Sequence, residues 1–212
     1  MDVLSVPYTP IVNPNLEAAL SALAGPSHSN AAAVDSVPDR PGLYAVHARV
    51  STRQALGLTA DFACQPLYVG KAERSLVSRD LRTHFETGMT GTSTLRRSFA
   101  ALLRQPLELH GIPRSRTNPD YFANFALDDE GERRLTHWMR TNLTLAAWAK
   151  PNDVILRPVE VGVLGLWAPP LNLTDVPTPS PRLKSARKVM AHEARGWAHD
   201  HGFNASGLDS RF

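Results

Sequence analysis

The chain has 212 residues, of which 42% are hydrophobic and 20% charged, and this length suits one globular domain with short extensions. Twenty-three basic and 20 acidic residues leave a formal charge of only +3, and the single cysteine excludes an internal disulfide or a multi-cysteine zinc site. A lone cysteine favours a reducing compartment, and neither a cationic signal segment nor an apolar stretch of the ~20 residues that span a membrane is found, so we expect a cytoplasmic protein with no membrane partner.

The first predicted element is a helix near the N-terminus. Asn13 can cap it, Pro14 suits its first position and Gly25 can end it. Leucines recur at helical spacing between these limits, as Leu16, Leu20 and Leu23. The stretch 26–33 has the composition of a loop, so residues 1–40 are predicted to be an N-terminal helix and linker.

Two short apolar segments bounded by proline and glycine then predict strands, at 42–48 and 66–70. A helix should follow the second strand, with an apolar side formed by Val77, Leu81 and Phe85. Another helix should begin near residue 92 or 93 and bury its leucines, with Arg96 and Arg97 pointing outward.

The second half of the chain alternates helix, strand and helix. Residues 128–140 place acids in a first turn and bases in a last turn, which favours a helix, and residues 143–149 predict a third strand. A core helix should then open with Pro158 at its first position and Glu160 in its first turn. Three prolines after residue 176 predict a stiff linker to a basic helix over 182–199.

These elements predict an α+β fold in which a small three-stranded antiparallel sheet is flanked by helices. The main domain should span 41–175, and the linker and basic helix should occupy 176–212.

Basic residues are concentrated in two zones. Between Lys71 and Arg116 there are nine basic and four acidic residues, and between Arg182 and Arg195 there are five and one. Nineteen of the 23 basic residues are arginines, whose planar fork suits phosphate. The two zones include Lys71, Arg82, Arg96, Arg97, Lys184, Arg187 and Lys188, which would contact the backbone of a nucleic acid if the chain binds one.

Two tripeptides on the predicted strands, Gly42-Leu43-Tyr44 and Tyr68-Val69-Gly70, are followed by Arg79 and His84. Further on, Glu160 stands 12 positions before Asn172. In this order and spacing the chain resembles the GIY-YIG nuclease superfamily over residues 41–173, with Leu and Val at the two isoleucine positions. A stretch at about 104–140 has no counterpart in the minimal domain of that superfamily and resembles an insertion.

The resemblance implies Mg²⁺-dependent hydrolysis of DNA phosphodiester bonds, with Mn²⁺ as a substitute ion. Glu160 would be the metal ligand, and a single carboxylate suffices because Mg²⁺ keeps several waters. Arg79 would contact the phosphate, and Tyr44 and Tyr68 would orient or activate the attacking water. All of these groups are expected to converge on one ion and one scissile bond.

The proton acceptor and the phosphate contact each have an alternative. A tyrosine with a pKa near 10 is a poor base by itself, and His84 is favoured over Lys71 to assist it because its ordinary pKa lies near 6.5. His84 stands five positions after Arg79, which turns their side chains about 140° apart on a helix, so Arg82 competes with Arg79 for the phosphate. Asn172 would hold Tyr68 or the water by hydrogen bonds.

Other functions fit the same residues. A non-catalytic DNA-binding or regulatory module on this fold would bind DNA without cleaving it, and a partner-binding protein would ignore DNA. Within the nuclease interpretation, restriction, repair and genome-defence roles are not separated. Sequence specificity would come from the insertion, the C-terminal helix or a homodimer.

Overall fold

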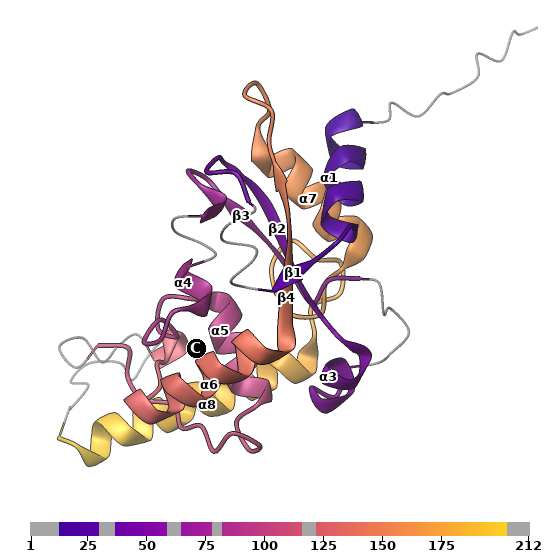
Figure 1. Cartoon of the computed structure of the whole chain (residues 1–212). Coiled ribbons are helices and arrows are strands. Elements are labelled where there is room, and N and C mark those ends of the chain that lie inside the picture. The colour runs from indigo at the N-terminus through magenta and orange to yellow at the C-terminus, as the bar shows by residue number, and fades with distance from the viewer. Residues whose placement is uncertain (1–12, 30–36, 59–64, 78–81, 116–121, 203–212) are drawn as a thin grey trace, which may run out of the picture.

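A computed structural model of the chain describes residues 13–29, 37–58, 65–77, 82–115 and 122–202 (Figure 1). A central sheet separates two groups of helices. Helices α1 and α7 lie together on one side of it, and α4, α5, α6 and α8 gather on the other (Figure 1).

The sheet has four antiparallel strands, not the predicted three, in the order β1-β4-β2-β3. The additional strand, β1 (His28–Ser29), pairs with the outer edge of β4. Its two exposed residues lie in the stretch interpreted as a loop, and two residues are too few to show strand periodicity. The bounds of the other strands are β2 (Gly42–Ala48), β3 (Tyr68–Ala72) and β4 (Leu143–Ala149).

The strands β2 and β4 have the predicted bounds, whereas β3 begins two residues later than predicted and continues to Ala72. In the β2–β3 register, Tyr44 lies opposite Gly70 and Leu43 lies opposite Lys71. Opposite residues share a face, as do residues two apart on one strand. Tyr44 and Tyr68 therefore lie on one face of the sheet, and Leu43 and Lys71 lie on the other.

The face that carries Leu43 is covered by α1 (Pro14–Ala24) and α7 (Leu156–Trp167). The side chain of Asn13 caps α1 as predicted, accepting hydrogen bonds from the backbone N–H groups of Asn15 and Leu16 at the start of the helix. Helix α7 begins two residues earlier than predicted. Pro158 is therefore its third residue, and Glu160 lies beyond the first turn, where its carboxylate faces the edge of the sheet.

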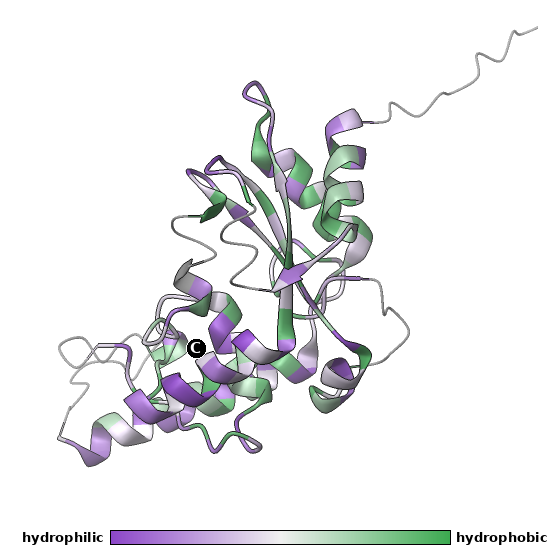
Figure 2. Cartoon of the chain, in the orientation of Figure 1, coloured by the Kyte–Doolittle hydropathy of each residue, from purple (hydrophilic) through white to green (hydrophobic). Residues whose placement is uncertain are grey.

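The face that carries Tyr44 packs against the larger core. Helix α5 follows the cap residue Ser93, and α6 follows the cap residue Asp128. The remaining bounds are α3 (Val50–Ala55), α4 (Arg82–Phe85), α5 (Thr94–Leu102), η3 (Phe122–Asn124), α6 (Asp129–Asn142) and α8 (Pro181–Asp200). Figure 2 shows mixed hydrophobic and hydrophilic colour along the strands and mainly hydrophilic colour along α6.

Helix α8 is part of this core and does not stand apart behind its linker. It packs against α5 and η3 and buries Leu183, Met190, Ala194 and Ala198. The inserted stretch also belongs to the core, since α6 contributes the buried Leu135 and Met139. Among the described helices, none combines the length and the apolar character that crossing a bilayer requires.

Candidate active site

Three aromatic rings meet on the α5 side of the sheet. Tyr44 comes from β2, Tyr68 from β3 and His84 from α4. The ring centroids of Tyr44 and Tyr68 are 6.2 Å apart, and that of His84 lies 5.5 Å from Tyr44 and 6.4 Å from Tyr68. A Cβ at Gly70 would lie 2.4 Å from the Tyr44 hydroxyl, so this position of the second tripeptide requires glycine.

His84 is held by hydrogen bonds on both ring nitrogens. Its Nε2 bonds to the Tyr44 hydroxyl, and its Nδ1 lies 2.6 Å from Oγ of Ser93. Ser93 Oγ also accepts the backbone N–H of Arg96 as the cap of α5, so the helix start fixes the ring. In the tautomer with its proton on Nδ1, His84 donates to Ser93 and accepts from Tyr44.

Burial, with the positive charge of Arg96 nearby, lowers the pKa of His84 to about 4. The imidazole is therefore neutral at pH 7, and its Nε2 accepts the hydrogen bond of the Tyr44 hydroxyl. The sequence pattern did not single out Ser93 as a site residue, although its position before a helical run is a typical cap signal.

Arg96 does not point outward as predicted. Its side chain is fully buried, and Nη2 lies 2.6 Å from Glu132 Oε2 and 2.8 Å from Thr136 Oγ1. Nη1 donates to the carbonyl of His84 and Nε donates to Thr90. The guanidinium is thus neutralised within the protein and supports the backbone that carries His84, which is incompatible with the predicted contact to DNA.

Arg97 is also wrongly predicted to point outward, since only 5% of it is exposed. Its guanidinium donates to the carbonyls of Thr90 and Gly91 and to the hydroxyl of Thr94. Both arginines are buried because α5 is enclosed on nearly all sides, with every residue from Leu95 to Ala101 buried.

A second group of polar residues surrounds Glu160. Lys71 Nζ lies 2.8 Å from Glu73 Oε1 and 3.6 Å from Glu160 Oε2. Arg157 Nη1 lies 3.3 Å from the same Oε2. The Arg157 guanidinium also donates two hydrogen bonds to the carboxylate of Asp175. The hydrogen bond to Glu73, assisted by the charge of Glu160, raises the pKa of Lys71. Within the described residues, Oε1 of Glu160 has neither a hydrogen bond nor an ion pair.

Asn172 binds β3, the strand that carries Tyr68 of the aromatic group and Lys71 of the polar group around Glu160. Its side-chain oxygen accepts the N–H of Val69 at 3.0 Å, and its side-chain nitrogen donates to the carbonyl of Val69 at 2.8 Å. The amide thus acts as a neighbouring strand would at the outer edge of β3. It holds the backbone next to Tyr68, whereas the prediction was that it would hold Tyr68 or the water by hydrogen bonds.

The predicted site residues therefore fall into two sets. Tyr44, Tyr68 and His84 are in contact on one face, and Lys71 and Glu160 are in contact on the other. Because the two sets occupy opposite faces of the sheet, Glu160 does not converge with the tyrosines on one face as expected. Arg79, and the side chain of Arg82, lie outside the described residues.

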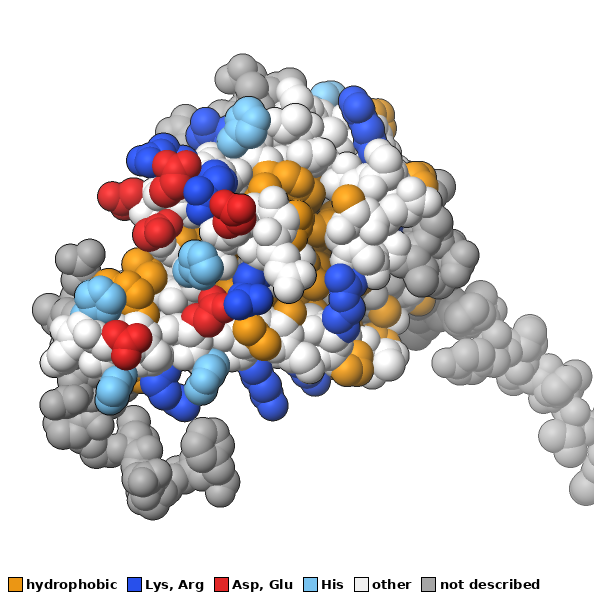
Figure 3. Space-filling view, turned by 90° about the horizontal axis from the view of Figure 1, so that it is seen from below, with side chains coloured by type: hydrophobic (Ala, Val, Ile, Leu, Met, Phe, Trp, Pro, Cys, Tyr) orange, Lys and Arg blue, Asp and Glu red, His pale blue; other side chains and the backbone are white. Residues whose placement is uncertain are grey.

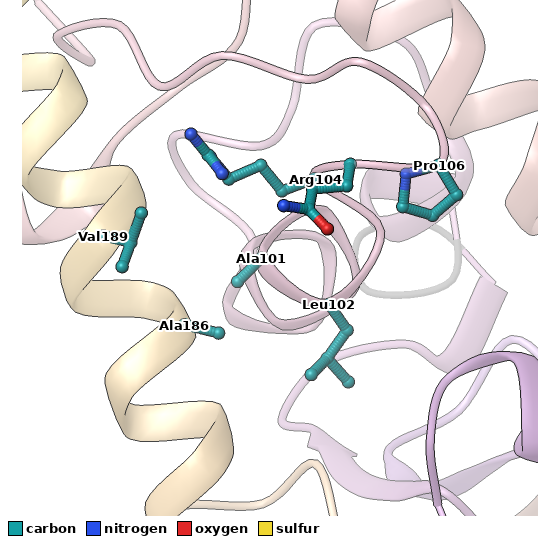
Figure 4. A pocket seen from close by; sticks show the side chains of 7 residues that line it. Ala101, Leu102, Arg104, Pro106, Ala186 and Val189 are labelled. Atoms are coloured by element: carbon teal, nitrogen blue, oxygen red, sulfur yellow. The ribbon is translucent and has the colours of Figure 1, made fainter.

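The basic residues of α8 differ in exposure. Lys184 and Lys188 are exposed, and Arg187 is half-buried. Seen from below, several Lys and Arg side chains project along the lower margin of the molecule, and others are mixed with Asp and Glu at the upper left (Figure 3). A pocket of about 230 Å³ lies between α5 and α8, lined partly by Ala101, Leu102 and Val189, but none of the predicted site residues lines it (Figure 4).

No group of three or more His, Cys, Asp or Glu side chains suited to a metal occurs within the described ranges. A site for Mg²⁺ can nevertheless be built on one carboxylate, because Mg²⁺ retains water ligands. The Oε1 of Glu160, which has no partner among the described residues, is a hard oxygen donor of this kind. The residues present therefore fit a magnesium ion held by Glu160.

Comparison with known proteins identifies a family. Residues 43–190 match a family whose description is GIY-YIG catalytic domain. The match covers more than two thirds of the chain and extends beyond the predicted domain end into α8. No curated protein and no solved structure matches the chain.

Proposed function

The chain belongs to the GIY-YIG nuclease family, and on this basis we propose that it is an endonuclease that hydrolyses DNA phosphodiester bonds with Mg²⁺, or with Mn²⁺ in its place. The observation that carries the proposal is the buried, neutral His84 hydrogen-bonded to the Tyr44 hydroxyl beside Tyr68. The two tyrosines lie on the two strands that hold the family's defining tripeptides.

Tyr44 and His84 act together on the attacking water. A phenol alone ionises too weakly at neutral pH to serve as a base. His84 Nε2 accepts the hydrogen bond of the Tyr44 hydroxyl while Ser93 holds Nδ1, so the Tyr44 oxygen is oriented to accept a hydrogen bond from the attacking water. Lys71 is less suited to this role, because its raised pKa keeps it protonated and its ammonium is paired with Glu73 and Glu160.

Glu160 would hold the divalent ion, and Lys71 and Arg157 fix its carboxylate through Oε2. When bound, the ion neutralises charge on the phosphate and stabilises the leaving oxygen. Because β3 is the edge strand of the sheet, a DNA backbone along that edge would reach groups on both faces. Asn172 keeps this edge in place by pairing both backbone groups of Val69.

Basic residues would hold the DNA backbone along this path. Arg79, with Arg82 as the alternative, contacts the non-bridging phosphate oxygens, and Lys184 and Lys188 follow the backbone from the exposed side of α8. Arg96 has no part in this contact, since Glu132 neutralises it in the core. The possible homodimer is supported by no observation on the described residues and is not proposed.

Two conservative substitutions test the function. Tyr44→Phe retains the ring and removes the hydroxyl, and Glu160→Gln retains the shape and removes the charge. Each should reduce Mg²⁺-dependent cleavage of supercoiled and linear DNA by about 10² to 10⁴-fold, the range expected for a proton-transfer group or an electrostatic contact. DNA affinity measured without Mg²⁺ should change little.

Glu130→Gln is the matched control, because it removes an exposed carboxylate from the far side of α6. It should cleave as the unmodified protein does. Undiminished cleavage by Glu160→Gln would refute the metal-ligand role. Salt-sensitive DNA binding with no cleavage in either metal would instead indicate the non-catalytic module.

A further inference from the structure

Three arginines from distant parts of the chain gather beside Tyr68. Arg97 comes from α5, Arg187 from the facing side of α8, and Arg114 from the segment before η3. The carbonyl of Gly91 accepts a hydrogen bond from Arg97. A Cβ at the same glycine would lie 2.8 Å from Cγ of Arg114, so the Arg114 side chain packs directly against this turn.

The charges of these groups affect one another. Burial, followed by the positive charges of Arg187 and Arg114, lowers the pKa of Arg97 to about 10. Burial also lowers the pKa of Arg187, and the Tyr68 hydroxyl is close enough to oppose the shift at both Arg97 and Arg187. The cluster therefore adjoins the aromatic part of the candidate active site.

Arg97 keeps unused donors. Nη1 makes two hydrogen bonds and Nη2 makes one, while the buried Nε has no partner among the described residues. A guanidinium has five N–H groups, so one on Nε and one on Nη2 remain. The Nε has no contact with solvent, so a phosphate would reach the exposed Arg114 and the half-buried Arg187, and Arg97 would contribute its positive charge.

The three arginines also lack acidic partners. Within the described residues no carboxylate lies within ion-pair distance of any of them, whereas Arg96, Arg104, Arg133, Arg134 and Arg157 each have one. Three neighbouring cations, one of them buried, repel each other in a region of reduced dielectric. A bound anion would remove that repulsion. The buried Arg53 also has no carboxylate partner among the described residues, but burial alone lowers its pKa, with no contribution from another arginine.

We propose that Arg97, Arg114 and Arg187 form a binding site for a phosphate group of the DNA backbone, next to the phosphate cleaved at the tyrosines. The identity of the ligand as DNA rests on the proposed function, whereas the affinity for phosphate does not. Helix α8, which lies far along the chain from the family's two tripeptides, then contributes Arg187 to positioning of the substrate.

The first test measures phosphate binding without any cleavage. Inorganic phosphate, compared with chloride at equal ionic strength, should raise the melting temperature of the unmodified protein, since a ligand that binds only the folded state stabilises it. Arg187→Gln and Arg114→Gln should each weaken the apparent phosphate affinity about tenfold, the loss expected for a charge-assisted hydrogen bond. Arg133→Gln removes one exposed charge from α6 and should keep the full effect.

The second test measures DNA binding in EDTA over a range of salt concentrations. Each of the two substitutions should reduce the slope of log affinity against log salt by about one, as expected when the protein neutralises one phosphate fewer. Arg133→Gln should leave the slope unchanged. Arg114 is exposed, so its variant keeps the test valid even if Arg187→Gln fails to fold.

The outcomes separate the two proposals. The site is supported if Arg114→Gln and Arg187→Gln each weaken the rise in melting temperature with phosphate and each reduce the salt slope of DNA binding. If these results hold and the unmodified protein cleaves no DNA, only the endonuclease function fails. A phosphate effect equal in Arg114→Gln, Arg187→Gln and Arg133→Gln would overturn the site. Loss of phosphate binding with an unchanged DNA slope would overturn its assignment to the DNA backbone.

Discussion

Arg96 and Arg97 are neighbours in the sequence, yet the structure gives them different roles. Arg96 has its charge matched by Glu132 and each of its nitrogens bonded, whereas Arg97 retains two donors and faces other cations. Burial of a charge is tolerated only where partners satisfy it. The difference between a structural and a binding arginine is therefore set by what lies opposite each guanidinium.

His84 makes the stability of the protein depend on pH. Its pKa is about 4 in the folded state and near 6.5 when unfolded, so between these values the unfolded chain binds more protons. Stability should therefore be complete above pH 6.5 and decrease as the pH falls to 4, by about 3 kcal/mol in total. Urea unfolding at pH 7, 6, 5 and 4 measures this loss.

The variant His84→Gln provides the comparison, because it cannot titrate. Its stability should be lower at pH 7 and should change less over the same range. If the two proteins lose equal stability between pH 6.5 and 4, His84 is not the group responsible.

At the scale of elements, β3 depends on a segment far along the chain. Its outer edge would expose the N–H and C=O of Val69, and the side chain of Asn172 pairs with both. Leu171 adds a backbone bond to Leu67 just before the strand. The end of α7 and the two prolines after it therefore place this segment where it holds the strand that carries Tyr68 and Lys71.

Asn172→Leu should destabilise the protein by about 2 kcal/mol, because it leaves two backbone groups of a buried strand without partners. Hydrogen exchange of the Val69 amide should become faster, and cleavage should fall with it because Tyr68 loses its fixed position. Thr174→Leu alters an exposed residue two positions away and serves as the control. An unchanged exchange rate at Val69 would contradict the role of Asn172.

For the whole molecule, the sheet divides two apolar cores of different composition. The core on the Tyr44 face includes residues of α5, α6 and α8, and the core on the Leu43 face includes residues of α1 and α7. The backbone at Gly111 also packs directly against α8, because a Cβ at this glycine would lie 2.1 Å from the carbonyl oxygen of Met190. The predicted domain end at residue 175 therefore cuts through a core.

A chain ending at residue 175 should not unfold cooperatively. It would lose four buried side chains of α8 and expose α5, and burying a Leu or Met side chain contributes about 1.5 to 3 kcal/mol each. Near-ultraviolet circular dichroism and urea unfolding measure the loss. The full-length variant Lys184→Ala, altered on the exposed side of α8, should unfold cooperatively.

Local patterns were enough to predict much of the fold. Short apolar runs between proline and glycine predicted β2, and a cap residue predicted the start of α1. The apolar pattern predicted α5, and the charges of the first and last turns predicted α6. The boundary of α7 was missed by two residues because Pro158 is tolerated anywhere in a first turn, where N–H groups lack helical partners. Within the site, the hydrogen bond of Tyr44 with His84 joins two residues that the sequence analysis selected.

The sequence by itself determined the family, through two tripeptides and the residues that follow in order, because those signals are short and local. Only the tertiary structure decided which side of the sheet each group occupies, which arginines are neutralised, and that α8 brings a third cation toward Tyr68. The reason is physical. Burial and charge pairing depend on contacts between segments far apart in the chain, and the local spacing of residue types does not specify those contacts.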